Sequence, residues 1–238
     1  MRAGVIEPDS RIAPTDDPEP GCTKKTRSAP AGRWNPDDFS KQQIHGLVRQ
    51  LFLSRMKSPI RQVVFAATES QTDVRNLCWR AGEALAEQTS QSIALVGDYP
   101  RLLLEAETDG EVTRGDLKRE FGTTRLAATR LKKNLWLVSS VEGNAVAPTS
   151  QTLHSYLSEI RSGFEYSIVA VPSVAESSAA IAMAQVADGI VLVVSAQHTR
   201  RVRARKIKEN LEAAQACLLG VVLNDRDFPI PERLYHTL

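Results

Sequence analysis

We predict an α/β fold for this chain, a mainly parallel β-sheet with helices on both faces. From residue 39 onward, apolar runs of strand length alternate with segments whose apolar residues recur at helical spacing. Several of these runs are continuously apolar, as expected of strands that are buried on both faces. The two observations together favour three layers with the sheet in the middle.

The first 38 residues are unlike the rest. They contain six of the twelve prolines, charges of both signs and almost no apolar periodicity. A segment of this composition has too little apolar surface to bury. We therefore expect a disordered arm at 1–38 and one domain at 39–238, because about two hundred residues with regular apolar runs can build one core.

The elements of the domain follow from these patterns. A first helix is expected at Phe39–Met56. Strands are expected at Gln62–Ala67, Ile93–Val96, Leu135–Ser139, Ser167–Val171, Gly189–Ser195 and Leu219–Leu223. Helices between them are expected at Asp73–Gln88, Thr149–Arg161, Ser177–Val186 and Thr199–Ala214. The irregular segment 101–133 suggests one or two short helices with loops.

Composition excludes several classes of protein. A net charge of +2 does not suit a dedicated nucleic-acid protein. Cys22, Cys78 and Cys217 are odd in number and lie on separate elements, so we expect a reducing, cytoplasmic compartment rather than a disulfide framework. The N-terminus has no apolar signal region, and no run of 18 apolar residues occurs, so we expect neither secretion nor a membrane span.

The loop that follows Gln62–Ala67 contains neither glycine nor lysine. A loop that grips nucleotide phosphates between a strand and a helix needs glycines, so that backbone N–H groups can approach the anion, and a lysine for the terminal phosphates. Here Glu69 and Asp73 would repel a phosphate. The loop therefore predicts a nucleotide-binding scaffold that has stopped hydrolysing nucleotide.

A basic run lies at 198–208. It is expected to be helical, with Val202, Ile207 and Leu211 on its apolar side. The run could be a solvated helix face, or it could contact an anionic membrane, an acidic protein or DNA. Its six basic residues are Arg200, Arg201, Arg203, Arg205, Lys206 and Lys208.

Three C-terminal segments, Gly163–Pro172, Ala187–Val194 and Leu219–Asn224, carry a resemblance to a known family. Their order and spacing resemble the P-loop ATPases with a deviant Walker A motif, which include MinD and ParA. Within that group the chain is most similar to the bacterial tyrosine autokinase domains of capsular and exopolysaccharide synthesis. The resemblance covers about residues 40–238 and implies a three-layer P-loop NTPase-like domain.

The phosphate-binding positions of the family do not match. The Walker A glycine, lysine and hydroxyl residue fall on Asp73, Val74 and Arg75. Phosphoryl transfer depends on neutralising charge and on positioning the nucleophile, and the lysine and hydroxyl serve both. The resemblance therefore implies a degenerate phosphate loop.

The metal-binding positions of the family do not match either. Its two Walker A′ aspartates fall on Gly97 and Tyr99, which leaves Asp98 one residue out of register. The Walker B aspartate falls on Ala170. With these carboxylates missing, we expect no catalytic residue, no metal and no cofactor.

Two other family patterns are partly present. Asn224 matches the asparagine that contacts adenine, although an asparagine at a strand end is also common for structural reasons. The family's oligomerisation pattern Glu-x-x-Arg-x-x-Arg falls on Gln43, Gly46 and Arg49, so one arginine matches. The chain ends with a single tyrosine, Tyr235, where the family has a tyrosine cluster.

The resemblance implies an inert pseudokinase, an accessory or regulatory binding component of exopolysaccharide synthesis or export. Its expected partner is a membrane chain-length regulator or an active tyrosine autokinase, met in the cytoplasm or at the inner membrane face. One alternative is an ATP- and Mg-dependent protein-tyrosine kinase that uses Arg75 and Asp98 in altered roles. Another is a ParA-like DNA-associated protein. The candidate partner-binding residues are Arg49, Arg200, Arg201, Arg203 and Arg205.

Overall fold

The computed structural model of the chain describes residues 36–54, 59–99, 128–139, 149–171, 173–174 and 178–225. All of them belong to one compact unit, 34–238. Nearly all of the predicted arm lies outside the described residues, and so do most of the segment 101–133 and Tyr235. The arm and its boundary stay predictions.

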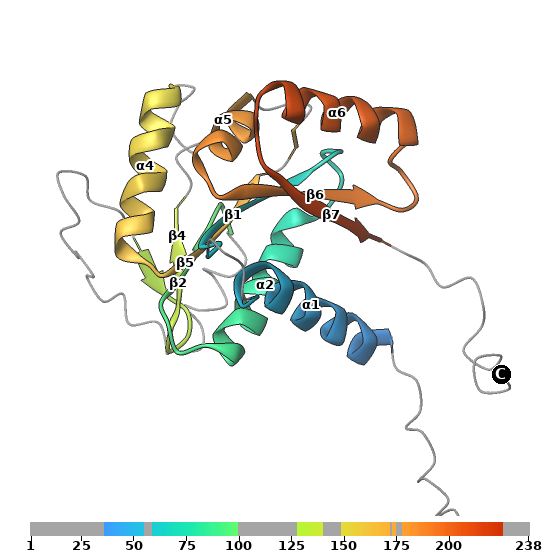
Figure 1. Cartoon of the computed structure of the whole chain (residues 1–238). Helices are drawn as coiled ribbons and strands as arrows, with labels where there is room; N and C mark the ends of the chain where they lie inside the picture. Colours follow the sequence, from blue (N-terminus) through green and yellow to red (C-terminus); the bar gives the residue numbers. More distant parts are fainter. Residues whose placement is uncertain are drawn as a thin grey trace, which may run out of the picture. The chain divides into compact units, whose positions relative to one another are not determined.

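A seven-stranded sheet forms the middle of this unit, in the order β3-β4-β2-β5-β1-β6-β7. Every neighbouring pair is parallel except β3 with β4. This confirms the mainly parallel sheet (Figure 1). The strands are β1 (Gln62–Ala67), β2 (Ile93–Val96), β3 (Ala128–Arg130), β4 (Leu135–Val138), β5 (Tyr166–Val171), β6 (Gly189–Ser195) and β7 (Leu218–Asn224).

Helices cover both faces of the sheet (Figure 1). Helices α1 and α2 pack on one face, and α4, α5 and α6 pack on the other, so each face has its own hydrophobic cluster. The predicted three layers are confirmed. The described helices are α1 (Pro36–Phe52), α2 (Val74–Gln88), α4 (Ser150–Gly163), α5 (Ser178–Val186) and α6 (Arg201–Ala213).

Strand β1 shows why continuous apolar runs become central strands here. All six of its residues are buried. Val63 and Phe65 pack in the cluster of α1 and α2, whereas Val64 and Ala66 pack in the cluster of α4, α5 and α6. Successive side chains of a strand point to opposite faces, so a strand with helices on both sides is apolar almost throughout. Gln62 is the polar exception in β1, and its Nε2 donates to the carbonyl oxygen of Leu157 at 3.1 Å.

The structure corrects three predictions. Helix α1 begins at Pro36, three residues before Phe39, because proline suits the first helical position and Asp37 and Asp38 follow it in the first turn. Ala128–Arg130 is a strand and not part of a helix or loop, since it pairs antiparallel with β4. Val202 does not lie on the buried side of α6, because its residue is 81% exposed.

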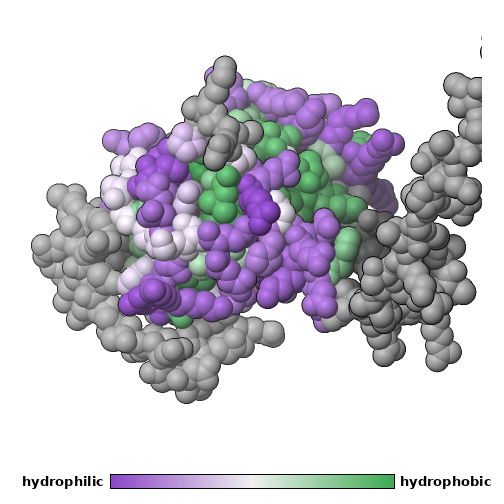
Figure 2. Space-filling view, turned by 60° about the horizontal axis from the view of Figure 1, so that its bottom comes forward, coloured by the Kyte–Doolittle hydropathy of each residue, from purple (hydrophilic) through white to green (hydrophobic). Residues whose placement is uncertain are grey.

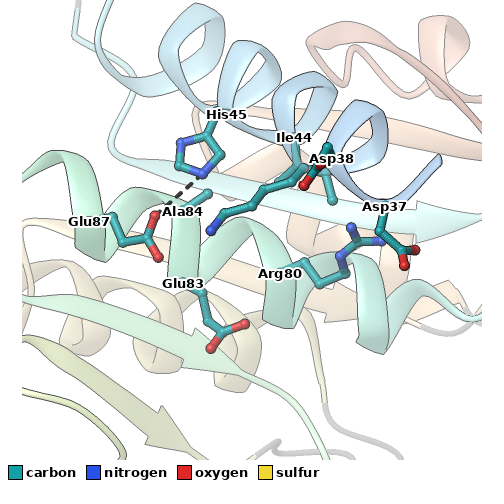
Figure 3. Close-up of a pocket in the computed structure, with 9 residues that line it drawn as sticks. Asp37, Asp38, Ile44, His45, Arg80, Glu83, Ala84 and Glu87 are labelled. Carbon is teal, nitrogen blue, oxygen red and sulfur yellow. Dashed lines mark ion pairs between the residues drawn. The ribbon is translucent and has the colours of Figure 1, made fainter. Parts of the chain in front are cut away.

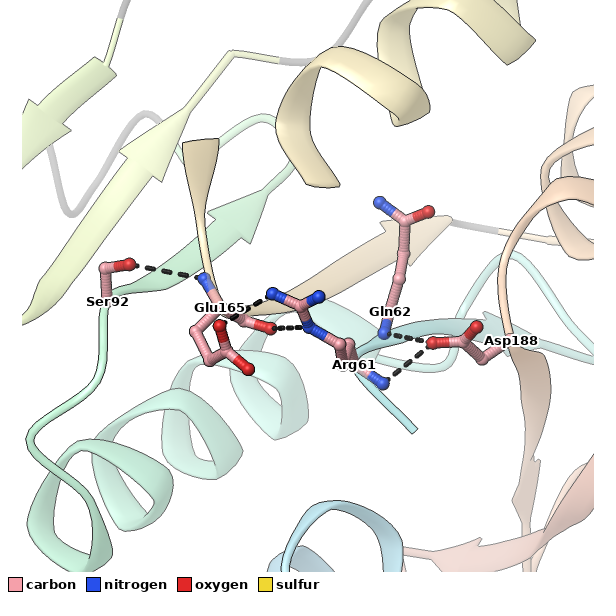
Figure 4. A network of polar contacts seen from close by, with 5 residues as sticks. All are labelled: Arg61, Gln62, Ser92, Glu165 and Asp188. Atoms are coloured by element: carbon pink, nitrogen blue, oxygen red, sulfur yellow. Dashed lines mark hydrogen bonds and ion pairs between the residues drawn. The ribbon is translucent and has the colours of Figure 1, made fainter. Parts of the chain in front are cut away.

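A polar network joins β1, β5 and β6 at their amino ends (Figure 4). Asp188 Oδ2 accepts hydrogen bonds from the backbone N–H groups of Arg61 (2.7 Å) and Gln62 (2.9 Å), and its Oδ1 accepts one from Arg161 Nη1 (2.8 Å). Arg61 Nη2 also pairs with Glu165 Oε2 at 2.6 Å. Burial would raise the pKa of Asp188, but these hydrogen bonds outweigh it and lower the pKa. The network holds the edge of the sheet opposite the candidate site.

Candidate functional site

The candidate site lies at the carboxyl ends of β1, β2 and β5. These strands are neighbours and parallel, so their carboxyl ends meet at one edge, the usual ligand-binding edge of such sheets. The loop after β1 runs from Thr68 to Asp73, and Gly97–Tyr99 follows β2. Ala170 is the penultimate residue of β5. The predicted phosphate and metal positions therefore lie at the same edge.

Backbone donors of the loop after β1 are hydrogen-bonded within the protein. The N–H of Thr68 donates to the carbonyl oxygen of Val193 at 3.0 Å, and that of Thr72 donates to Glu69 O at 3.2 Å. The N–H of Val74 donates to Thr72 O at 2.9 Å. In a phosphate-gripping loop, donors of this kind point at the anion instead. This loop satisfies these three donors internally.

The two carboxylates of this loop, Asp73 and Glu69, also make contacts within the protein. Asp73 Oδ1 accepts a hydrogen bond from Asn76 N at 3.0 Å and so caps α2. Glu69 Oε2 lies 3.0 Å from Arg203 Nη1, and its side chain is only 16% exposed. The Asp73 carboxylate therefore occupies the start of α2, where an anion would bind, and the Glu69 carboxylate is held by α6.

Arg75 and Asp98, the residues of the alternative kinase mechanism, are in contact. Arg75 Nη1 donates to the backbone carbonyl of Asp98 at 3.3 Å, and both residues are exposed. Val74, by contrast, is buried as the first residue of α2. Arg75 therefore reaches across to the loop after β2.

The Tyr99 ring packs against Gly97, one of the predicted metal-binding positions, and Ala170 is the next neighbour of Gly97. Tyr99 is only 5% exposed, and a Cβ added at Gly97 would lie 2.8 Å from its Cε2 atom and 3.4 Å from the Ala170 Cβ. The positive φ of Gly97, +156°, also favours glycine. Two small residues thus leave room for one aromatic ring. Any larger side chain at position 97 would collide with that ring.

Tyr99 and Cys78 form a buried, neutral pair. Burial raises the pKa of Tyr99 well above its usual value, and the nearby Cys78 raises it further without reaching hydrogen-bond geometry. Burial likewise raises the pKa of the Cys78 thiol. Among the described residues, the buried hydroxyls of Tyr99 and Thr72 have no hydrogen-bond partner. Both raised pKa values keep Tyr99 and Cys78 neutral near neutral pH.

Two of the predicted metal-binding positions at this edge of the sheet carry no side-chain oxygen. Mg²⁺ prefers oxygen ligands, usually carboxylates and phosphates, in near-octahedral geometry. Within the described ranges no group of three or more His, Cys, Asp or Glu residues could hold a metal ion. Gly97 and Ala170 offer no side-chain ligand, and the space beside them holds the Tyr99 ring.

Asn224 is placed differently from the other predicted positions. It is the last residue of β7, where its Nδ2 donates to Asp225 Oδ1 at 3.1 Å. Together with Asp73 it lines a groove of about 1010 Å³ between α1, the start of α2 and the end of β7. The structure therefore brings Asn224 to the start of α2.

A smaller groove of about 390 Å³ lies between α1 and α2 (Figure 3). His45 Nε2 lies 3.4 Å from Glu87 Oε2 across it, and His45 Nδ1 contacts Gln88 Nε2 at 3.2 Å. The mixture of charges favours no ligand of one sign. Its charged lining residues are Asp37, Asp38, Lys41, His45, Arg80, Glu83 and Glu87.

The candidate partner-binding arginines lie on two separate helices. Arg49 is exposed on α1. Arg200, Arg201 and Arg205 are exposed at the start of α6 and make no ion pair within the described part of the chain. Arg203 differs from them because it pairs with Glu69 of the loop, a contact that the sequence did not indicate.

A second contact between the loop and the segment before α6 was also missed. Thr68 Oγ1 and Thr199 Oγ1 are 2.8 Å apart, and Thr199 Oγ1 also accepts from Ser195 N at 3.2 Å. Nothing in the sequence pairs two threonines 131 positions apart. The Tyr99 packing, in contrast, has a signal. Small residues at 97 and 170, where the family has carboxylates, leave a volume that a nearby large side chain must fill.

The chain is similar to known proteins in sequence and in fold. No protein-family model matches it. It is 27% identical over 164 residues to the tyrosine-protein kinase CpsD of Streptococcus agalactiae, which spans 61% of this chain and 71% of that protein. The crystal structure of the VpsO kinase domain superposes with a TM-score of 0.57 at 16% identity, over 80% of this chain and 98% of the other.

A similarity to MinD supports the same fold. The MinD chain in the MinC:MinD cell division complex of Aquifex aeolicus gives a TM-score of 0.50 at 19% identity, over 68% of each chain. In the described residues, no helix has the length and apolar character needed to cross a membrane. The chain thus has the P-loop NTPase-like fold shared by MinD and by bacterial tyrosine kinase domains, and its sequence is related to that of a bacterial tyrosine-protein kinase.

Proposed function

We propose that this protein is a catalytically inert relative of the bacterial tyrosine kinases that acts by binding. Its role would be accessory or regulatory in exopolysaccharide synthesis or export. The observation that carries the proposal is the buried Tyr99 ring against Gly97, which leaves no room for a side chain where the resemblance places a metal-binding aspartate.

The energetic reason lies in how phosphoryl transfer is catalysed. The protein's contribution is almost entirely positioning and electrostatic stabilisation. Loss of one electrostatic donor already costs about 3 kcal/mol of transition-state stabilisation. Here the metal carboxylates are replaced by a neutral ring, and Glu69 and Asp73 add negative charge beside the loop. These changes together leave no route to a useful rate.

Two features support the binding role, the hydrophobic clusters on the two faces of the sheet and the exposed arginines at the start of α6. Among the described residues, each face of the sheet has a buried hydrophobic cluster, so the frame would persist without the chemistry. Arg200, Arg201 and Arg205 present unpaired positive charge at the start of α6 within the described residues. A partner with an acidic surface fits this patch, and we propose a membrane chain-length regulator or an active tyrosine kinase. The site of action would be the cytoplasmic face of the inner membrane.

Calorimetric titration with Mg-ATP tests the inert character. We expect no binding at millimolar nucleotide, and no phosphotyrosine after incubation with radiolabelled ATP. Arg75→Ala is the matched variant, because Arg75 is the residue that could replace a lysine at this edge. Micromolar binding by the natural chain that disappears in Arg75→Ala would overturn the proposal in favour of an active kinase.

The regulatory role needs a separate test with a defined partner. The protein is titrated into two purified candidates. One is the cytoplasmic segment of the chain-length regulator encoded nearest to this gene, and the other is the active kinase of the same operon. We expect binding that weakens when Arg200, Arg201 and Arg205 are changed together to glutamine. Binding to random duplex DNA that is lost in the same variant, without binding to either protein, would favour the DNA-associated alternative.

A further inference from the structure

We propose that strand β7 is a self-association site through which two copies of the chain pair as antiparallel strands. The two-fold axis would pass near Val222. This inference is independent of the proposed function, because it uses a different edge of the sheet and no nucleotide chemistry.

The first observation is an open sheet edge. Among the described strands, β7 is last in the order and pairs only with β6. Its seven residues, Leu218–Asn224, include no charged residue and no proline. Proteins usually protect such edges with charges, prolines or bulges because an unpaired edge invites another strand. Strand β7 has neither a charge nor a proline, and its one register irregularity, at Leu219, lies before the stretch Gly220–Asn224.

The second observation is exposed apolar surface on this strand. Val221 is 59% exposed and Leu223 is 56% exposed, the two largest values for bulky apolar residues outside α6 in the described part of the chain. Val222 between them packs against the cluster of α1 and α2. Side chains alternate along a strand, so Val221 and Leu223 share the opposite face. Figure 2 shows hydrophobic side chains reaching the surface among hydrophilic ones.

The backbone directions fit a second strand. The carbonyl of Asn224 accepts from Ala196 N at 2.9 Å and so faces the β6 side. Residues two apart in a strand point their backbone groups to the same side, so Val222 also faces β6. The N–H and C=O groups of Val221 and Leu223 therefore point outward, where a neighbouring strand would bond them.

A second copy satisfies both observations at once. With the axis at Val222, Val221 of one copy lies opposite Leu223 of the other, and these two residues exchange hydrogen bonds. The same pair recurs on the other side of the axis, so four exposed side chains gather on one face. Cross-strand pairs of apolar side chains stabilise such sheets. Because β7 carries no charge, no like charges meet.

Sedimentation velocity across a range of protein concentrations tests this proposal. We expect the mass of two chains at tens of micromolar or above. Leu223→Lys and Val221→Lys should each weaken the dimer by at least about tenfold, because every substitution occurs twice in a symmetric interface. Val202→Lys is the matched control. It adds the same charge at a valine that is 81% exposed on α6, and it should leave the dimer unchanged.

A proline variant tests the backbone pairing separately from the side chains. Leu223→Pro removes an N–H that points away from β6, so the β6–β7 ladder stays intact while the new pairing loses a donor. Thermal unfolding must show each variant to be folded. A single-chain mass at every concentration would overturn the proposal. So would a dimer that Val202→Lys weakens as much as Leu223→Lys does.

Discussion

Replacing the Tyr99 ring tests whether it fills the candidate site as part of the core. Tyr99 is 5% exposed and touches the small residues Gly97 and Ala170, which cannot expand to fill a cavity. Truncation of a buried aromatic side chain to alanine costs about 3–5 kcal/mol. We expect Tyr99→Ala to lose about 3 kcal/mol, at the low end of that range, because the tyrosine hydroxyl has no partner among the described residues.

The comparison with Tyr99→Phe sharpens this expectation. Removing a buried hydroxyl without a partner relieves a desolvation cost, so Tyr99→Phe should be neutral or more stable by up to about 1 kcal/mol. Asp98→Ala is the control, since an exposed neighbour should change stability by less than about 0.5 kcal/mol. Urea unfolding followed by tryptophan fluorescence measures all three. A Tyr99→Ala loss below about 1 kcal/mol would refute the packing role of the ring.

Three further predictions concern the frame. Asp188→Asn should lose about 1–3 kcal/mol at pH 7, because a carboxylate with a lowered pKa stabilises the fold above its unfolded pKa. That loss should shrink as the pH falls through the lowered pKa, and urea unfolding with an equal loss at pH 7 and below about pH 4 would contradict it. Gly189→Ala should cost about 1–3 kcal/mol in thermal unfolding, since its Cβ would lie 2.5 Å from Leu219 Cγ, whereas Gly220→Ala meets nothing within 4 Å and should cost less than half as much. Glu69→Gln should lose under about 1 kcal/mol with its ion pair, and unfolding in about 1 M salt should remove most of the difference.

The central strands could be predicted from the sequence because their burial is uniform. The bounds of β1, β2 and β6 are those expected, those of β4 and β5 differ by one residue at one end, and β7 is one residue longer at each end. A strand between two helical layers is apolar at most positions, and this leaves a clear run of apolar residues in the sequence. Helix ends shifted more, because they depend on local capping, as Pro36 shows for α1.

Strand β3 could not be predicted, because tertiary pairing defines it. Ala128–Arg130 is three residues long and gains its conformation from β4, where Arg130 also lies over the Trp136 ring at 5.4 Å.

The wrong prediction for Val202 has a geometric cause. A step of five residues to Ile207 rotates about 140° around a helix, so these two side chains cannot share a narrow stripe.

The proximity of the predicted site positions followed from the fold, but their packing did not. Parallel neighbours bring the ends of β1, β2 and β5 together, so Arg75, Gly97 and Ala170 were expected at one edge. The packing at that edge depends on the rotamer of Tyr99, which decides whether its ring points into the core or into solvent. The Tyr99 ring turns inward toward Cys78, and no periodicity in the sequence encodes that direction.

The Tyr99 packing also limits how catalysis could return to this chain. Protein interiors are close-packed, so a larger side chain at Gly97 or Ala170 needs a smaller one at Tyr99. Ala170→Asp alone would bury a charge against the neutral Tyr99 and Cys78 pair, where an unpaired carboxylate raises its pKa and neutralises. A metal-binding carboxylate therefore requires the ring to leave at the same time, and removal of the ring alone opens a cavity. Each of these single substitutions lowers stability, so the packing around Tyr99 opposes the introduction of a metal-binding carboxylate one residue at a time.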